Sequence, residues 1–230
     1  MELITFLLRV AVFTLFAALP SVHAGSTYYD IPWNQTSGET FNVTINQKVD
    51  PNSENGRISD SYRVYLALTP PGWGTGPVCW LQWLVPLYET QVNITIPPDA
   101  APDGARIMLS TCLTSAKKGG KRITGWDYSG RTMISGSNAT WSQAELDGRN
   151  IGDQDEVSCE AYGCVRSCYD QYYKGDSDDE EYSRKSYACW KACARDLNPS
   201  STASLMTMPI QSLLGVGVAV GFLHLIIGAL

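Results

Sequence analysis

The chain has 230 residues, with 17 basic and 23 acidic side chains, and its formal net charge is −6 at pH 7. This acidic balance argues against nucleic acid or an anionic membrane surface as the main partner. The length suits one domain with an appendage, or two small domains.

The first 24 residues have the pattern of a secretory signal peptide. An apolar run from Leu3 to Leu19 leads to Val22-His23-Ala24, a small-residue cleavage site, so Gly25 would begin the mature chain. Glu2 is acidic and Arg9 interrupts the apolar run, which departs from the ideal pattern. A first transmembrane helix is the alternative, but the run is short and ends in a cleavage motif.

Residues 25–147 predict a β-sandwich domain. Short segments of alternating or continuous apolar character are separated by turns rich in Gly, Pro, Asp and Asn, and no helical period of useful length occurs. About seven or eight short strands with frequent turns favour two packed sheets. The predicted strands are Phe41–Ile45, Tyr62–Leu68, Val78–Val85, Val92–Ile96, Arg106–Leu113, Ile123–Tyr128, Arg131–Ile134 and Thr140–Ala144.

Four N-glycosylation sequons lie in this stretch, at Asn34, Asn42, Asn93 and Asn138, each with Thr two residues later. A single sequon is a weak signal, but four of them behind a signal peptide predict a secreted glycoprotein. Glycan acceptors mark exposed positions. In Val92–Ile96 the alternation therefore points Asn93 outward and the apolar residues inward.

Four stretches of this domain carry a family resemblance. They are Gly38–Thr44, Pro70–Cys79, Pro102–Met108, and Gly125–Ser129 followed by Trp141-Ser142. Together they resemble fungal secreted GPI-anchored surface proteins with an Ig-like β-sandwich, akin to the serine/threonine-rich GPI-anchored and yeast cell-wall-synthesis families. The resemblance spans about residues 31–146 and implies a non-enzymatic domain at the cell wall or plasma membrane. Such proteins often carry a long Ser/Thr-rich stalk, and here only residues 198–207 could serve as one.

Residues 148–197 predict a Cys-rich helical hairpin. Cys164-x3-Cys168 and Cys189-x3-Cys193 each place two thiols one helical turn apart. The expected helices span about 159–173 and 178–196, the second beginning with a capping box from Ser177. Antiparallel helices would pair Cys164 with Cys193 and Cys168 with Cys189. Zinc is the alternative, but a secreted context favours disulfides, so neither a metal nor a cofactor is expected.

Three cysteines remain outside this twin motif. Cys79 and Cys112 lie on two predicted strands, so a bond between them is the simplest pairing. Cys159 would then be a free thiol, available to another chain or to a wall component. The alternatives are a buried, inert Cys159, or a bond from Cys159 to one of the other two.

Residues 198–230 have the layout of a GPI-attachment signal. Small residues at 200–204 precede a short spacer and an uncharged tail, Leu213 to Leu230. Ser201 is the expected attachment residue, with Ser200 and Ser204 as rivals, so about 202–230 would be removed. A transmembrane helix is the alternative, but no Lys or Arg follows the tail. The expected partners are the outer leaflet of the plasma membrane, through the lipid anchor, and cell-wall polysaccharide or another surface protein.

Removal of both ends would leave no histidine, since the chain has only His23 and His224. Histidine-dependent triads, dyads and metal sites would then be excluded. No phosphate-binding loop, dinucleotide fingerprint or metalloprotease motif occurs, and no carboxylate pair lies in a recognisable glycosidase motif. We therefore predict no catalytic residue and no enzyme activity.

Trp73, in the Gly/Pro-rich loop 70–77, is the candidate ligand-binding residue, because exposed indoles suit recognition surfaces. Packing within its own loop is the alternative.

The basic turn 117–122 fits a solvated hairpin tip or a contact for acidic glycans or lipid headgroups. The acidic run 176–181 fits helix capping better than calcium binding. Two functions follow: a structural or interaction protein of the fungal surface, or a carbohydrate- or ligand-binding module acting through the Trp73 loop or the hairpin.

Overall fold

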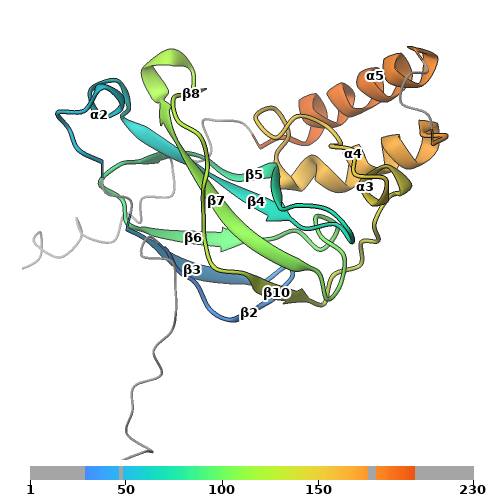
Figure 1. Ribbon diagram of the computed structural model, residues 1–230, viewed down its shortest axis with the longest axis horizontal. Coiled ribbons are helices and arrows are strands. Elements are labelled where there is room, and N and C mark those ends of the chain that lie inside the picture. The colour runs from blue at the N-terminus through green and yellow to red at the C-terminus, as the bar shows by residue number, and fades with distance from the viewer. Residues whose placement is uncertain (1–28, 47–48, 176–179, 200–230) are drawn as a thin grey trace, which may run out of the picture.

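The structure is a computed structural model that describes residues 29–46, 49–175 and 180–199. The predicted signal peptide, Ser201 and the C-terminal tail lie outside the described residues, as does Ser177 of the predicted capping box. The described chain is mainly β, with two sheets facing each other and a pair of disulfide-linked helices at one end (Figure 1). The prediction of a mainly β fold followed by a helical hairpin is confirmed.

The smaller sheet has three antiparallel strands in the order β1-β3-β6, where β1 is Tyr29–Asp30, β3 is Thr40–Ile45 and β6 is Gln91–Thr95. Alternation along β3 and β6 buries the apolar side chains and exposes the polar ones. Asn42 and Asn93 are direct cross-strand partners on the exposed face.

The larger sheet has the strand order β2-β10-β7-β4-β5, and all of its neighbours are antiparallel except the parallel pair β2 and β10. Two short strands, β8 and β9, add to β7. A short helix, α2 (Glu54–Ile58), and a 3-10 turn at Ala116–Lys118 lie at the upper end in Figure 1. The strands are β2 (Asn34–Thr36), β4 (Ser61–Leu68), β5 (Gly76–Pro86), β7 (Arg106–Ser115), β8 (Lys121–Arg122), β9 (Asp127–Tyr128) and β10 (Thr132–Ser135).

Both faces of the larger sheet are covered, and every residue of β4 is buried. Val64 and Leu66 belong to the main core, which also contains the inward side chains of the smaller sheet. Tyr65 points to the other face and packs with Trp80 and Cys112 in a separate cluster. The protein therefore has a main core between the sheets and a smaller one outside the larger sheet.

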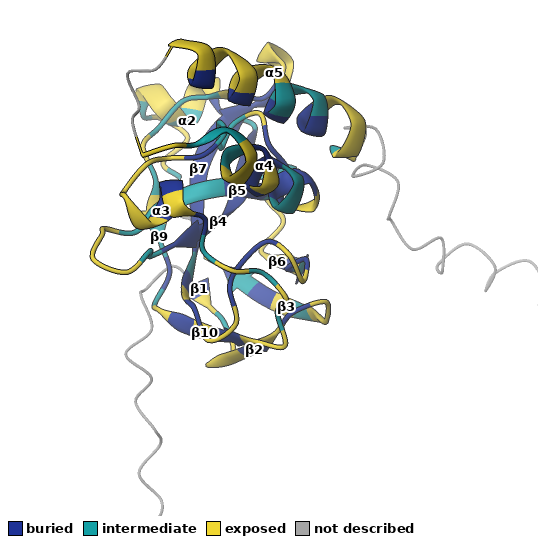
Figure 2. Ribbon diagram, turned by 90° about the vertical axis from the view of Figure 1, so that its right-hand side faces the viewer, coloured by how far each residue is buried: buried dark blue, intermediate teal, exposed yellow. Residues whose placement is uncertain are grey.

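Three helices follow the strands: α3 (Gln143–Leu146), α4 (Cys159–Tyr172) and α5 (Glu180–Leu197). Ser158 caps α4 by accepting a hydrogen bond from the backbone N–H of Ala161. Buried side chains of α4 and α5 join the main core, so the core continues across the expected domain boundary at residue 147. Figure 2 shows α5 with its buried residues toward the rest of the protein and its exposed residues outward.

Most predicted strands are present, but three local predictions differ from the structure. The expected strand 140–144 is wrong, because Ser142 and Glu145 form a capping box that begins helix α3 instead. The expected strand 123–128 is wrong in extent, because the regular strands there are only β8 at Lys121–Arg122 and β9 at Asp127–Tyr128. The strands β1 and β2 and the helix α2 were not predicted; each has six residues or fewer, too few for a clear period.

The two hairpin disulfides, Cys164–Cys193 and Cys168–Cys189, have the predicted pairing. The predicted bond between Cys79 and Cys112 is wrong, and so is the free thiol at Cys159. Cys79 bonds to Cys159, and Cys112 is the free cysteine among the described residues.

The faces of the larger sheet explain this error. Cys79 is the cross-strand partner of Leu66, whereas Cys112 is the partner of Arg63. Leu66 and Arg63 are three residues apart on β4, so their side chains lie on opposite faces. Cys79 accordingly lies in the main core and Cys112 in the outer cluster, and the sheet separates the two sulfurs.

Candidate functional site

The predicted binding residue Trp73 lines a surface cavity of about 330 Å³ where the loop after β4 meets the turn after α3. The cavity has an apolar wall from the sheet and a polar rim from residues 148–150. Its lining is Leu68, Pro70, Trp73, Gly74, Thr75, Gly76, Val78, Glu145, Gly148, Arg149, Asn150, Ile151 and Tyr162.

The Trp73 ring is held in place and half-exposed. Its Nε1 donates a hydrogen bond of 2.8 Å to the carbonyl oxygen of Leu146. Gly148 lies against the ring: a Cβ built there would come within 2.4–2.6 Å of three ring carbons. Its φ of +76° also favours glycine. The indole remains 50% exposed, so it packs against its own chain and still offers a surface to a ligand.

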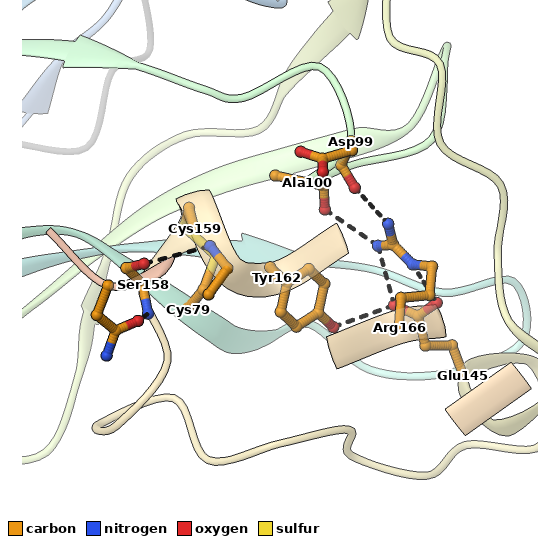
Figure 3. Close-up of a disulfide and its surroundings, with 10 residues drawn as sticks. Cys79, Asp99, Ala100, Glu145, Ser158, Cys159, Tyr162 and Arg166 are labelled. Atoms are coloured by element: carbon orange, nitrogen blue, oxygen red, sulfur yellow. Dashed lines mark hydrogen bonds and ion pairs between the residues drawn. A yellow bond between two sulfur atoms is a disulfide. The ribbon is translucent and has the colours of Figure 1, made fainter. Parts of the chain in front are cut away.

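A buried polar network lies beneath this cavity, centred on Arg166 of α4 (Figure 3). The guanidinium donates to both carboxylate oxygens of Glu145, at 2.9 and 3.3 Å, and to the carbonyls of Asp99 and Ala100. Tyr162 also donates to Glu145, at 3.1 Å. Burial acts to lower the pKa of Arg166, but the hydrogen bonds to Glu145, together with the charges of Tyr162, Glu145 and Asp170, raise that pKa overall. The network fastens α4 to α3 and to the 99–100 loop.

A second cavity, of about 240 Å³, lies beside the first and shares Arg149 and Asn150 with it. This cavity was not predicted from the sequence. Tyr187 is 55% exposed at its rim and meets Trp190 edge-on, with ring centroids 5.3 Å apart. The sequence did contain one indication of it, because Tyr187 directly follows Ser186 in the helical series Tyr182, Ser186, Trp190, which is buried. The lining is Arg149, Asn150, Tyr169, Tyr182, Ser183, Ser186, Tyr187 and Trp190.

The outer cluster of the larger sheet contains the second buried arginine. Arg63 forms an ion pair of 2.9 Å with Asp155, and its guanidinium lies 3.4 Å from the ring centroid of Trp83. Tyr65 donates to the same carboxylate at 2.6 Å and lies 3.3 Å from the Cys112 sulfur. These contacts fasten the loop around Asp155 onto the sheet.

Cys112 is poorly suited to nucleophilic chemistry. Burial is the main cause that raises the pKa of its thiol, and the thiolate is the reactive form. The hydroxyl of Tyr65 and the charge of Arg63 act in the opposite direction but do not outweigh burial. A structural role for Cys112 follows.

The basic turn 117–122 lies at the tip of a hairpin, in agreement with the prediction of a solvated hairpin tip. Lys117 and Lys118 are exposed there, and Asp60 accepts a hydrogen bond of 2.6 Å from the backbone N–H of Ala116. Arg122 stacks over Trp126 at 3.9 Å from the ring centroid and lies 3.6 Å from Asp155. This contact ties the base of the tip to the outer cluster.

All four sequon asparagines are exposed. Asn34 lies on β2, Asn42 on β3 and Asn93 on β6, while Asn138 follows β10. These elements form the lower part of Figure 1, whereas α4 and α5 lie at the upper right. Asn42 Nδ2 donates to Asn93 Oδ1 at 3.1 Å, so two sequons meet at one point. None of the four lines either cavity described above.

The hairpin cysteines also form the candidate metal cluster among the described residues. The sulfurs of Cys168, Cys189 and Cys193 lie within 4.8 Å of one another. All three are in disulfide bonds, so they offer no thiolates to a metal. The acidic run predicted at 176–181 lies mostly outside the described residues.

Within the described part of the chain, no helix has both the length and the apolar character needed to cross a bilayer. No protein-family model matches this sequence, and no curated protein is significantly similar to it.

Proposed function

We propose that this protein is a GPI-anchored, N-glycosylated surface protein with a structural or interaction role at the fungal cell wall and plasma membrane. The observation that carries the proposal is the placement of the four sequons. Every acceptor asparagine is exposed, and none lines the cavities that contain Trp73 and Tyr187. Glycans at these positions would leave these two cavities open to a partner.

The disulfides support an extracellular location. Six of the seven cysteines are bonded, and disulfides form and persist in oxidising compartments. The bond between Cys79 and Cys159 joins β5 to the first residue of α4, so the hairpin is covalently attached to the sheet. This linkage suits a small protein that works outside the cell.

We also infer that the two sheets form an Ig-like domain of the variable type. The order β10-β7-β4-β5 corresponds to the G-F-C-C′ order of such domains, and β1-β3-β6 corresponds to A-B-E. The usual disulfide between strands B and F is missing here, because β3 has no cysteine and Cys112 on β7 is free. Packing between the sheets would replace that bond.

The chain leaves the folded part close to the expected anchor. Asn198 donates to the carbonyl oxygen of Glu156 at 2.6 Å and accepts from the backbone N–H of Ser158 at 2.9 Å. From Asn198 to Ser201 the chain can span at most about 10 Å. An anchor on Ser201 would therefore hold the folded part close to the membrane, which favours a role at the membrane surface over one deep in the wall.

A non-enzymatic role fits the described side chains. Glu145 is the buried carboxylate beside the Trp73 cavity, and Arg166 and Tyr162 occupy it. Cys112 is buried with a raised pKa. Neither group is free to act as an acid, a base or a nucleophile.

Release of the anchor tests the proposal. The full chain is expressed in a eukaryotic host, intact cells are treated with phosphatidylinositol-specific phospholipase, and the released protein is weighed by mass spectrometry. We expect a glycosylated chain that runs from Gly25 to about Ser201. A variant that ends at Ser212 and lacks the hydrophobic tail should pass into the medium without phospholipase. Retention of the full-length protein in the membrane, with Leu230 still attached, would contradict the anchor.

A further inference from the structure

We propose that the two neighbouring cavities form one extended binding site for a neutral oligosaccharide, with Trp73 and Tyr187 as its aromatic platforms. The inference deepens the interaction role proposed above by naming a ligand class. It rests on that role, but it does not depend on the lipid anchor, and the two can fail separately.

The cavities are joined by the residues that they share. Arg149 and Asn150 line both of them, with Trp73 on one side and Tyr187 on the other. Their volumes, about 330 and 240 Å³, place the combined site in the range of about 300–1,000 Å³ typical of small-molecule sites. A ligand that fills both must be elongated, because the shared residues lie between them.

The two aromatic side chains suit the faces of sugar rings. A pyranose ring presents an apolar C–H face and a rim of hydroxyl groups, so it requires an apolar ring surface with polar groups beside it. Trp73 is fixed by the hydrogen bond to Leu146 and by contact with Gly148. Tyr187 is supported by the edge of Trp190 and by Lys191, whose Nζ lies 5.4 Å from the Tyr187 ring centroid. Rings that are already ordered lose little conformational entropy when a ligand binds.

The groups between the platforms supply hydrogen bonds without a strong net charge. Arg149 offers guanidinium donors, and Asn150 offers both a donor and an acceptor; both residues are exposed. Asp147 lies close to Arg149, since both act on the hydroxyl of Tyr173, with opposite effects on its pKa. The opposite charges offset each other, which favours a neutral ligand over a phosphorylated, sulfated or uronic acid polymer.

The site also stays accessible on the glycosylated protein. The four sequons lie on β2, β3, β6 and the segment after β10, and none contributes to either lining. The exposed aromatic residues Trp33 and Tyr88, by contrast, line neither cavity. Trp73 and Tyr187 therefore lie in cavities that no acceptor asparagine lines.

The test is a binding series with the full-length glycosylated protein, purified in mild detergent from a eukaryotic host. Neutral gluco-, manno- and chito-oligosaccharides of one to six residues are titrated by calorimetry, beside a sulfated oligosaccharide of equal length. We expect binding of a neutral series, with an affinity that rises with chain length until both cavities are filled. Trp73→Ala and Tyr187→Ala should each weaken binding of the longer ligands by at least about fivefold.

Matched variants separate recognition from folding. Trp33→Ala and Tyr88→Ala remove rings that are 72% and 75% exposed outside the site, and they should leave the affinity unchanged. Tyr187 lies on the exposed face of α5, so its replacement should keep the thermal midpoint even if Trp73→Ala lowers it. The absence of binding by any neutral oligosaccharide, equal losses in the control variants, or preference for the sulfated ligand would each overturn the proposal. None of these results bears on the anchor, which phospholipase release tests alone.

Discussion

At the scale of single residues, two buried arginines fasten loops to the sheets. Arg166 joins α4 to Glu145 and to the carbonyls of the 99–100 loop. Arg63 joins β4 to Asp155 and to the carbonyl oxygen of Gly120. A buried charge without its partner is costly, so each arginine and its carboxylate must be kept together.

We expect Arg166→Met to lower the free energy of unfolding by about 3–5 kcal/mol, because it leaves the Glu145 carboxylate buried and unpaired. Urea unfolding followed by circular dichroism measures the change. Arg131→Met, at an exposed position, should alter stability by less than about 0.5 kcal/mol. A small effect of Arg166→Met would show that Glu145 can be satisfied without it.

Cys112 should behave as a hidden thiol. Burial raises its pKa, so a thiol reagent near pH 8 should react very slowly with the folded protein. In denaturant without a reductant, one thiol per chain should react at once. Rapid reaction of the folded protein would contradict the burial, and two or more thiols would contradict the pairing.

Local spacing could predict two of the three disulfides but not the third. Cys164, Cys168, Cys189 and Cys193 are placed by the helical period alone, and antiparallel helices then determine their partners. The partner of Cys79 depends on which face of β5 it occupies. That face depends on the register with β4, which shifts at three points along the pair. No pattern within β5 alone contains this information.

At the scale of elements, the start of α4 is held to the edge of the larger sheet. The Cys79–Cys159 bond is accompanied by a hydrogen bond of 3.0 Å from the N–H of Trp80 to the carbonyl oxygen of Val157. The ion pair of Lys191 with Glu156 ties α5 to the same segment. These contacts fix the position of α4 and α5 relative to the sheet. They therefore also fix the position of the second cavity, which α5 lines.

The double variant Cys79→Ser/Cys159→Ser should lose about 2–5 kcal/mol of stability, because it removes a crosslink between residues 80 positions apart. Cys112→Ala, which breaks no bond, should lose clearly less in the same urea titration. If Cys112→Ala proved the more damaging change, the assigned pairing would be wrong.

Helices and strands that are long and have a clear hydrophobic period were predicted best from the sequence. The long helices α4 and α5 and the alternating strand β6 were predicted close to their observed bounds. The segment 140–144 was not, because its capping box competes with its β-forming residues Thr140 and Trp141. Trp73 was predicted as a binding residue, whereas its contact with Gly148 and the neighbouring cavity result from tertiary packing that the sequence pattern does not contain.

At the scale of the whole molecule, buried tyrosines make the stability of the fold depend on pH. Tyr29, Tyr62, Tyr65 and Tyr162 have pKa values raised above 10, with burial as the first cause in each case. In the unfolded chain these phenols ionise near pH 10, while in the folded chain they stay protonated to higher pH. Above pH 10 the unfolded state therefore binds fewer protons than the folded state, and stability falls as pH rises.

We expect the stability contributed by these tyrosines to be constant below about pH 9. It should then decline by up to about 1.4 kcal/mol per pH unit for each of them above pH 10. The measurement is urea unfolding between pH 7 and 11, with tyrosinate absorbance recorded in parallel. Ionisation of the buried tyrosines should coincide with unfolding. Full ionisation near pH 10 while the circular dichroism spectrum stays native would contradict their burial.

The sequons and the Cys79–Cys159 disulfide both bear on where the protein is made and how its two parts are joined. Three of the four sequon asparagines lie on strands and Asn138 follows β10, while the hairpin is linked to β5 by Cys79–Cys159. That bond and the proposed N-glycans would both be made in an oxidising secretory compartment. We propose that the protein is secreted and that the hairpin, fixed to the β-domain by Cys79–Cys159, forms part of a recognition surface.

A non-reducing peptide map of the protein purified from eukaryotic cells, with free thiols alkylated before digestion, tests this proposal. We expect the pairs Cys79–Cys159, Cys164–Cys193 and Cys168–Cys189, an alkylated Cys112, and glycans at the four sequons. A Cys79–Cys112 peptide with alkylated Cys159 would contradict the attachment of the hairpin to the sheet. Free thiols at all seven cysteines, with unmodified asparagines, would contradict the extracellular role.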